Sequence, residues 1–261
     1  MKNSFWLILL LLPITAFKGP QADTSFKNFD LGEVMKFKVH YGFVNAGEAV
    51  MTIDKKIHQY NNRPCYKMEV EGRSVGFFDL ITTIRDTWGS YVDTATLVPY
   101  KFYRDIREAK YRKKETTLFK RDIDSAFVYD LDKKTNAVKK VKKYKTPENV
   151  QDMVSGYYFM RTFDFDEIAK GEIVTIPGFF EDEVYNLKVR FLGREELDTR
   201  IGKFTALKLA PIMPKNSLFE GEDSIVAWIS DDDKRIPLKI KARMFVGAVE
   251  IDIRSYQAGS R

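Results

Sequence analysis

Cysteine and histidine are nearly missing from this sequence. Its 261 residues contain one cysteine, Cys65, and two histidines, His40 and His58. One cysteine cannot form an internal disulfide, and zinc, copper or haem sites need His or Cys ligand clusters that this composition does not supply. We therefore expect no metal and no cofactor. Because a nucleophilic cysteine needs a basic partner, Cys65 is expected to be a small buried residue on a strand.

The motifs of nucleophilic and phosphate chemistry are also missing. The sequence has no G-x-S-x-G elbow and no glycine-rich phosphate loop, and Ser155 falls inside a predicted helix. Adjacent carboxylates need separate attention, because two of them on one concave sheet could hydrolyse a glycosidic bond. Glu181, Asp182 and Glu183 form such a run, so a carboxylate-dependent glycan hydrolase is kept as an alternative. Since acidic turns are common, we expect a protein that is not an enzyme.

Long hydrophobic runs are absent after the first residues. Lys2 precedes the apolar run FWLILLLLPITA, which ends at Ala16. The run is shorter than the roughly 20 residues that cross a membrane, and it has the layout of a secretory signal peptide. We predict a signal peptide over residues 1–22, cleaved after Ala16 or Ala22, and no transmembrane segment in the mature chain. Because no cysteine follows the run, we expect a protein of the periplasm or outer envelope without an N-terminal lipid anchor.

Linker-like stretches rich in Pro, Gly and Ser are absent, so residues 23–261 are predicted to form one domain. Nearly every segment alternates apolar and polar residues. In EVMKFKVHY, for example, Met35 and Phe37 alternate with Lys36 and Lys38. This period is typical of antiparallel strands with one dry face, and about a dozen such runs are separated by turn residues. The pattern predicts a mainly β fold, an antiparallel β-roll or open barrel of long hairpins.

One segment has helical spacing instead. In KTPENVQDMVSGYYFMRTF, Thr146 is a suitable N-cap and Pro147 suits the first helical position. Val150 and Met153 then begin an apolar stripe at helical intervals. We predict one central amphipathic helix over about residues 146–163, packed on the sheet.

The chain is basic, with a formal charge of +6 and a pI near 9.1. Positive residues are densest in Tyr111–Arg121 and Asp132–Lys145. In an exported protein, this balance favours anionic partners such as lipid, lipopolysaccharide or acidic glycan over nucleic acid. The alternative is that both segments are simply the solvated faces of hairpins.

Aromatic residues make up 14% of the sequence. Most should lie in the core, but some could line a groove for a lipid chain or a sugar, and Gly76–Phe78 places apolar bulk at an apparent bend. The candidate ligand-binding residues are Tyr41, Phe77, Phe78, Trp88, Tyr158, Arg161 and Trp228. If Arg161 faces the sheet it must be paired, and its structural alternative is a salt bridge to an aspartate such as Asp152 or Asp86.

The segment WISDDDKRIPLKIKA contains three consecutive carboxylates, Asp231, Asp232 and Asp233, beside Lys234 and Arg235. Adjacent side chains on a strand point to opposite faces, so three in a row cannot converge on one ion. The run also lacks the spaced oxygen ligands of a calcium loop. Because Ser and Asp favour turns and the segment lies between two alternating strands, we predict a hairpin turn.

Three stretches together carry a family resemblance: GEVMKFKVHYGFVNAGEAVMTI, DMVSGYYFMRTF and AWISDDDKRIPLKIKARMFVGAVEIDI. They resemble, in order, the opening strand and turn, the central helix and the closing hairpin of the bacterial exported family named domain of unknown function 3108. The matching positions are Tyr41, Gly42, Ala46, Gly47, Asp152, Ser155, Tyr158, Arg161, Trp228, Asp232, Arg235, Pro237 and Gly247. The resemblance covers nearly the whole mature chain. It implies a spiral β-roll, similar to that of capsule-associated periplasmic lipoproteins, and no established activity.

These observations lead to one functional hypothesis and two alternatives. We expect an exported, non-catalytic envelope protein that binds an amphiphile or an anionic glycan, in cell-envelope biogenesis. The alternatives are the glycan hydrolase and a scaffold that docks partner proteins through sheet edges or the Gly76–Phe78 bend.

Overall fold

The computed structural model describes residues 26–212, 223–245 and 247–260. The predicted signal peptide lies outside them. The strands are β1 (Val34–Tyr41), β2 (Val44–Ile53), β3 (His58–Tyr60), β4 (Arg63–Ser74), β5 (Arg85–Asp93), β6 (Pro99–Glu108), β7 (Tyr111–Lys120), β8 (Ser125–Leu131), β9 (Val138–Lys145), β10 (Ile173–Phe180), β11 (Glu183–Thr199), β12 (Gly202–Pro211), β13 (Ile225–Ser230), β14 (Pro237–Arg243) and β15 (Ala248–Gln257). The helices are α1 (Gly76–Ile81) and α2 (Met153–Met160), with a 3-10 turn η1 (Arg121–Ile123).

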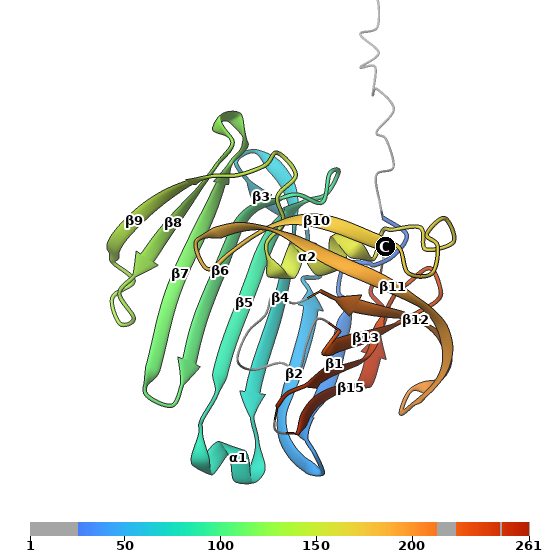
Figure 1. Ribbon diagram of the computed structural model, residues 1–261. Helices are drawn as coiled ribbons and strands as arrows, with labels where there is room; N and C mark the ends of the chain where they lie inside the picture. Colours follow the sequence, from blue (N-terminus) through green and yellow to red (C-terminus); the bar gives the residue numbers. More distant parts are fainter. Residues whose placement is uncertain (1–25, 213–222, 246, 261) are drawn as a thin grey trace, which may run out of the picture.

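All the strands belong to one antiparallel sheet that curls around α2 (Figure 1). Its order is β10-β11-β12-β13-β14-β15-β1-β2-β4-β5-β6-β7-β8-β9, with β3 attached to β4. The first and last strands of the chain, β1 and β15, are neighbours, and Phe37 and Ile253 face each other across this pairing as buried residues. The predicted mainly β, open antiparallel roll is confirmed.

The two edges of the sheet, β10 and β9, are not hydrogen-bonded to each other, and side chains close the gap. Phe179 of β10 packs against Phe119 and Tyr144, with ring centroids 6.2 and 5.5 Å away. In the turn that follows, Glu181 pairs with Arg104 of β6 and with Lys113 of β7. The Arg104 and Lys113 cations hold the pKa of Glu181 down to about 2, so this closure is charged at neutral pH.

The central helix is shorter than predicted. It begins after Asp152 rather than at Thr146, and it ends at Met160. The segment before it is extended because the N–H of Gln151 donates to the Pro177 carbonyl at 2.8 Å, as part of a parallel bridge to β10. Asp152 is the true N-cap: its carboxylate accepts from the backbone N–H groups of Val154 and Ser155. The prediction also missed α1, the second helix.

Cys65 is fully buried on β4, as predicted, and burial raises the pKa of its thiol to about 11. Much of the basic segment Asp132–Lys145 forms β9, an edge strand with exposed lysines. Charged edge strands resist pairing with other chains. Within the described residues, neither helix is long and apolar enough to cross a membrane.

Candidate functional site

An apolar cavity of about 430 Å³ lies between α2 and the inner face of the sheet. Alternate residues of the strands supply one wall, because successive side chains of a strand point to opposite faces. The sheet contributes Phe37, Met51, Val70, Trp88, Ile240 and Ile251, among others. Every residue lining it is aliphatic, aromatic, proline or methionine. A volume of this size is typical of small-molecule sites.

Helix α2 forms the opposite wall. Met153, Tyr157 and Met160 line the cavity, and they follow each other at the spacing of one helix face. Met153 is about half exposed although it is large and apolar. The helical spacing placed Met153 on the apolar stripe, but the stripe alone does not distinguish a cavity wall from a filled core.

The start of α2 is fixed to the sheet by a buried carboxylate. The Ser90 hydroxyl of β5 donates to Asp152 Oδ2 at 2.6 Å, and the other oxygen caps the helix. Burial raises the pKa of Asp152 to about 6, although these hydrogen bonds act in the opposite direction. Asp152 therefore positions the helix wall and does not line the cavity.

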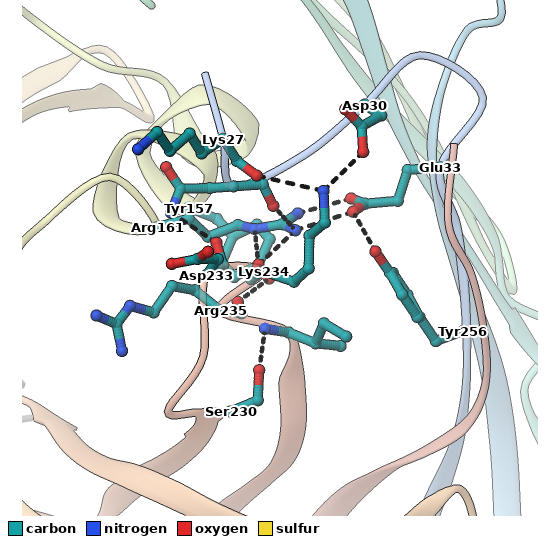
Figure 2. Close-up of polar contacts among 12 residues, drawn as sticks. Lys27, Asp30, Glu33, Tyr157, Arg161, Ser230, Asp233, Lys234, Arg235 and Tyr256 are labelled. Carbon is teal, nitrogen blue, oxygen red and sulfur yellow. Dashed lines mark hydrogen bonds and ion pairs between the residues drawn. The ribbon is translucent and has the colours of Figure 1, made fainter. Parts of the chain in front are cut away.

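The end of α2 is fixed by Arg161, which is 1% exposed (Figure 2). Its guanidinium forms a two-point ion pair with Glu33, with Nη1–Oε1 and Nη2–Oε2 distances of 2.6 and 2.9 Å. It also donates to the backbone carbonyls of Asn28 and Lys234. Tyr256 donates a longer bond of 3.3 Å to Glu33. The expectation that a buried Arg161 must be paired is confirmed, but the partner is Glu33 and not Asp152 or Asp86.

The aspartate-rich segment 231–235 contacts Arg161 and the residues around it. Residues 231–235 form the turn between β13 and β14, as predicted, and Asp232 accepts the backbone N–H groups of Lys234 and Arg235. Lys234 pairs with Asp30 at 2.6 Å and presents its carbonyl to Arg161. The turn therefore connects the N-terminal segment to the end of α2.

Of the seven candidate ligand-binding residues, only Trp88 lines the cavity. Its indole N–H is buried and meets no acceptor among the residues that the structure describes. Tyr158 is fully buried against Phe29 and Tyr157. Trp228 lies between two cavity-lining residues of β13, so it points to the other face, where its N–H donates to Glu195.

The remaining candidates are at one end of the sheet, away from the cavity. The rings of Tyr41 and Phe78 are in contact, with centroids 6.3 Å apart, and Phe77 is 66% exposed on α1. The exposed apolar bend predicted at Gly76–Phe78 is thus confirmed, as part of a short helix. The structure does not bring the seven residues together into one groove.

The two acidic runs of the sequence lie at turns, and Glu183 is the first residue of β11. Glu181 and Asp182 are in ion pairs with Arg104, Lys113 and Lys142. Asp231 pairs with Arg194 and Arg235. These cations keep the pKa values of Glu181 and Asp231 below the ordinary range, which suits an ionised partner and not a general acid.

A second hollow, of about 480 Å³, is lined by four cations and one carboxylate, Glu48, which is paired with Arg73. Lys36 and Lys38 of β1, Arg200 beyond the end of β11 and Arg254 of β15 all contribute to it. No carboxylate of residues 26–212, 223–245 or 247–260 lies within ion-pair distance of these four cations. We call it the basic groove.

The histidines are not grouped with other ligands. His40 lies 3.1 Å from Asp252 on the neighbouring strand, and His58 lies 2.8 Å from Asp54. Among the described residues, no three His, Cys, Asp or Glu side chains are arranged to hold a metal ion.

A family model and several solved structures are similar to this chain. The family described as "Protein of unknown function (DUF3108)" matches residues 36–254. A beta-barrel-like protein of the family DUF1849 from Brucella abortus has a similar structure, with a TM-score of 0.56 at 8% identity over 89% of this chain and 99% of that chain. A hypothetical protein from Chlamydia trachomatis gives a TM-score of 0.37 at 10% identity, over 90% and 91% of the two chains. No curated protein matches.

Proposed function

We propose that this chain, which belongs to the DUF3108 family, is an exported, non-catalytic protein of the cell envelope whose roll binds the apolar part of an amphiphile. The observation that carries the proposal is the cavity between α2 and the sheet. An acyl chain placed there would gain about 0.8 kcal/mol for each methylene removed from water. A sugar would lose hydrogen bonds with water and find almost none in return, which disfavours binding. An amphiphile therefore fits this cavity better than a glycan.

The arrangement of α2 supports this proposal. Both ends of the helix are fixed by buried polar groups, Asp152 and Arg161, while the face between them presents Met153, Tyr157 and Met160 to the cavity. Methionine side chains are flexible and adapt to irregular apolar ligands. A wall that is held at its ends and adaptable in its middle suits a lipid chain.

The basic groove supports the anionic-ligand alternative. Its four cations lack described carboxylate partners, and such cations attract phosphate or carboxylate groups. A glycan hydrolase has less support, because the proposed carboxylates are occupied in ion pairs on turns. The predicted signal peptide supports the remaining part of the proposal, which is a location in the cell envelope and a role in its biogenesis.

The test is lipid extraction and mass spectrometry of protein purified without detergent, followed by titration with a fluorescent fatty acid. Ala49 lines the cavity from β2, so Ala49→Phe should fill part of it and weaken binding by at least about tenfold. Ala137→Phe, at an exposed position beside β9, is the matched control and should bind as the unmodified chain does. If no lipid co-purifies and no fatty acid binds, the proposal is wrong. It is also wrong if Ala49→Phe folds and binds normally.

A further inference from the structure

Among the residues that the structure describes, the most exposed large apolar side chains gather at one end of the sheet. Five large apolar residues are between 62% and 107% exposed, whereas no other described one exceeds 55%. We call these five the tip surface: Phe43, Phe77, Leu80, Ile81 and Phe245. Isolated exposed apolar residues are normal, but a group of this kind marks a contact site.

The topology places these residues together. Strands β14, β15, β1, β2, β4, β5, β6 and β7 are consecutive neighbours in the antiparallel sheet, so their alternate connections lie at the same end. Phe43 is in the β1–β2 turn, Phe245 in the β14–β15 turn, and the other three are on α1 between β4 and β5. Figure 1 shows α1 beside the β1–β2 turn at the lower end of the sheet.

Backbone contacts join these connections to one another. The N–H of Gly42 donates to the Ala248 carbonyl at 3.3 Å, which links the β1–β2 turn to β15. The N–H of Val75, just before α1, donates to the Ala46 carbonyl of β2 at 3.1 Å. The ring contact between Tyr41 and Phe78 fixes α1 to the same turn. The tip surface is therefore a set of apolar side chains on two turns and a helix that are joined by hydrogen bonds and a ring contact.

Some backbone groups of these connections are paired internally. In α1 the Phe78 carbonyl accepts from Thr82 at 2.8 Å, and in the β14–β15 turn the N–H of Met244 donates to Gly247 at 3.1 Å. Internally paired backbone groups avoid the cost of leaving water. The five side chains come from two turns and one short helix.

The connections around the tip surface carry three exposed cations, and their carboxylates include Asp79 of α1, which is paired with Arg85, and Glu108 at the end of β6. Lys110 and Arg112 are exposed in and beside the β6–β7 turn, which the Ala109-to-Thr83 hydrogen bond of 2.8 Å joins to the end of α1. Arg243 is exposed at the end of β14. No described carboxylate lies within ion-pair distance of these three cations. Apolar side chains that enter the interface, together with basic residues that meet lipid headgroups, are the two features of a peripheral membrane contact.

We propose that the tip surface docks this protein on a lipid bilayer that contains anionic lipids, with the five apolar side chains inserted among the headgroups and Lys110, Arg112 and Arg243 against phosphates. This contact is independent of the cavity, since none of the five residues lines it. Loss of fatty-acid binding and loss of bilayer docking can therefore be observed separately.

The test is co-sedimentation of the chain starting at residue 23 with sucrose-loaded vesicles of phosphatidylcholine, alone or in equal mixture with phosphatidylglycerol. Phe43→Ser with Leu80→Ser should weaken binding by at least about tenfold. Lys110→Gln with Arg112→Gln should weaken binding to the mixed vesicles by about tenfold and leave the weaker binding to phosphatidylcholine unchanged.

The matched control replaces apolar residues that are exposed at the other end of the sheet. Ile57→Ser with Ile123→Ser removes side chains that are 39% and 49% exposed, and it should bind vesicles as the unmodified chain does. Phe245→Ser is a second tip variant in case the double variant does not fold, which thermal melting would show. The proposal is overturned if the unmodified chain does not sediment with mixed vesicles, or if the control loses binding equally. Light scattering that shows a dimer dispersed by the tip variants, without vesicle binding, would assign the surface to a second copy instead.

Discussion

Replacing Arg161 with methionine should destabilise the protein strongly, because the change leaves a buried carboxylate without its cation. Glu33 is fully buried, and after the substitution only the 3.3 Å bond from Tyr256 would remain to it among the contacts described above. Breaking a buried pair by removing one partner costs about 3–5 kcal/mol. The carbonyls of Asn28 and Lys234 would lose donors as well, which places Arg161→Met toward the upper part of that range.

The double variant Glu33→Leu with Arg161→Met isolates the interaction energy between these two side chains from their interactions with the rest of the protein. It removes both charges, so it should lose less free energy of unfolding than the sum of the single variants, with a coupling of about 2 kcal/mol or more. Arg73→Met is the control, because Arg73 also pairs with a glutamate but its side chain is 62% exposed. That exposed pair should contribute below about 1 kcal/mol.

Urea unfolding at pH 7, followed by circular dichroism, measures all of these changes. The reasoning is refuted if Arg161→Met costs no more than Arg73→Met. It is also refuted if the two single variants are additive in the double variant, since the pair would then contribute nothing as a pair.

Two other predictions concern buried titratable groups. Burial raises the pKa of Asp152 from 3.8 to about 6, so the folded state holds this proton more tightly than the unfolded state, and the free energy of unfolding should fall as pH rises through that window. The unmodified chain should lose about 3 kcal/mol more than Asp152→Asn, a variant that keeps a cap acceptor. Urea unfolding of both proteins from pH 4 to pH 7 measures this difference. If both proteins show the same dependence of the urea midpoint on pH, the prediction is wrong. Cys65 is fully buried, and its thiol pKa is about 11, so a thiol reagent at pH 8 should label it only as the protein unfolds. Rapid labelling of the native protein would contradict the position of Cys65 in the core.

Alternation along the strands was enough to predict the fold class. Met35 and Phe37 are buried and Lys36 is exposed, as the period of two requires. The turn at residues 231–235 and the buried Cys65 also followed from local sequence. In each case the deciding property is short-range, because strand period and turn preference depend on neighbouring residues.

Long-range pairing could not be predicted in the same way. Thr146 and Pro147 are residues that favour the start of a helix. Gln151, however, forms a parallel bridge with Gly178 of β10, so the helix begins only after Asp152. The partner of Arg161 is Glu33, 128 residues away, although aspartates closer in sequence were available. Such choices are set by the order of strands in the sheet.

The candidate site shows the same limit. Trp88 and Trp228 both lie on alternating strands, and alternation does not say which parity faces inward. The structure places Trp88 at the cavity and Trp228 on the opposite face of its strand. The sequence favoured Tyr158 as a ligand-binding residue, but Tyr157 lines the cavity and Tyr158 is buried in the core. Neighbouring residues of a helix point in directions about 100° apart, so a shift of one position separates a core residue from a cavity wall.

The central claim is that an acyl chain occupies the cavity beside Trp88, and fluorescence quenching tests it most directly. In a chain with Trp6 and Trp228 replaced by phenylalanine, Trp88 is the only indole. A fatty acid brominated along its chain should quench Trp88 in a saturable manner, and Ala49→Phe in the same background should weaken this quenching by at least about tenfold. Emission from Trp88 that does not change as the brominated fatty acid is added would contradict the claim.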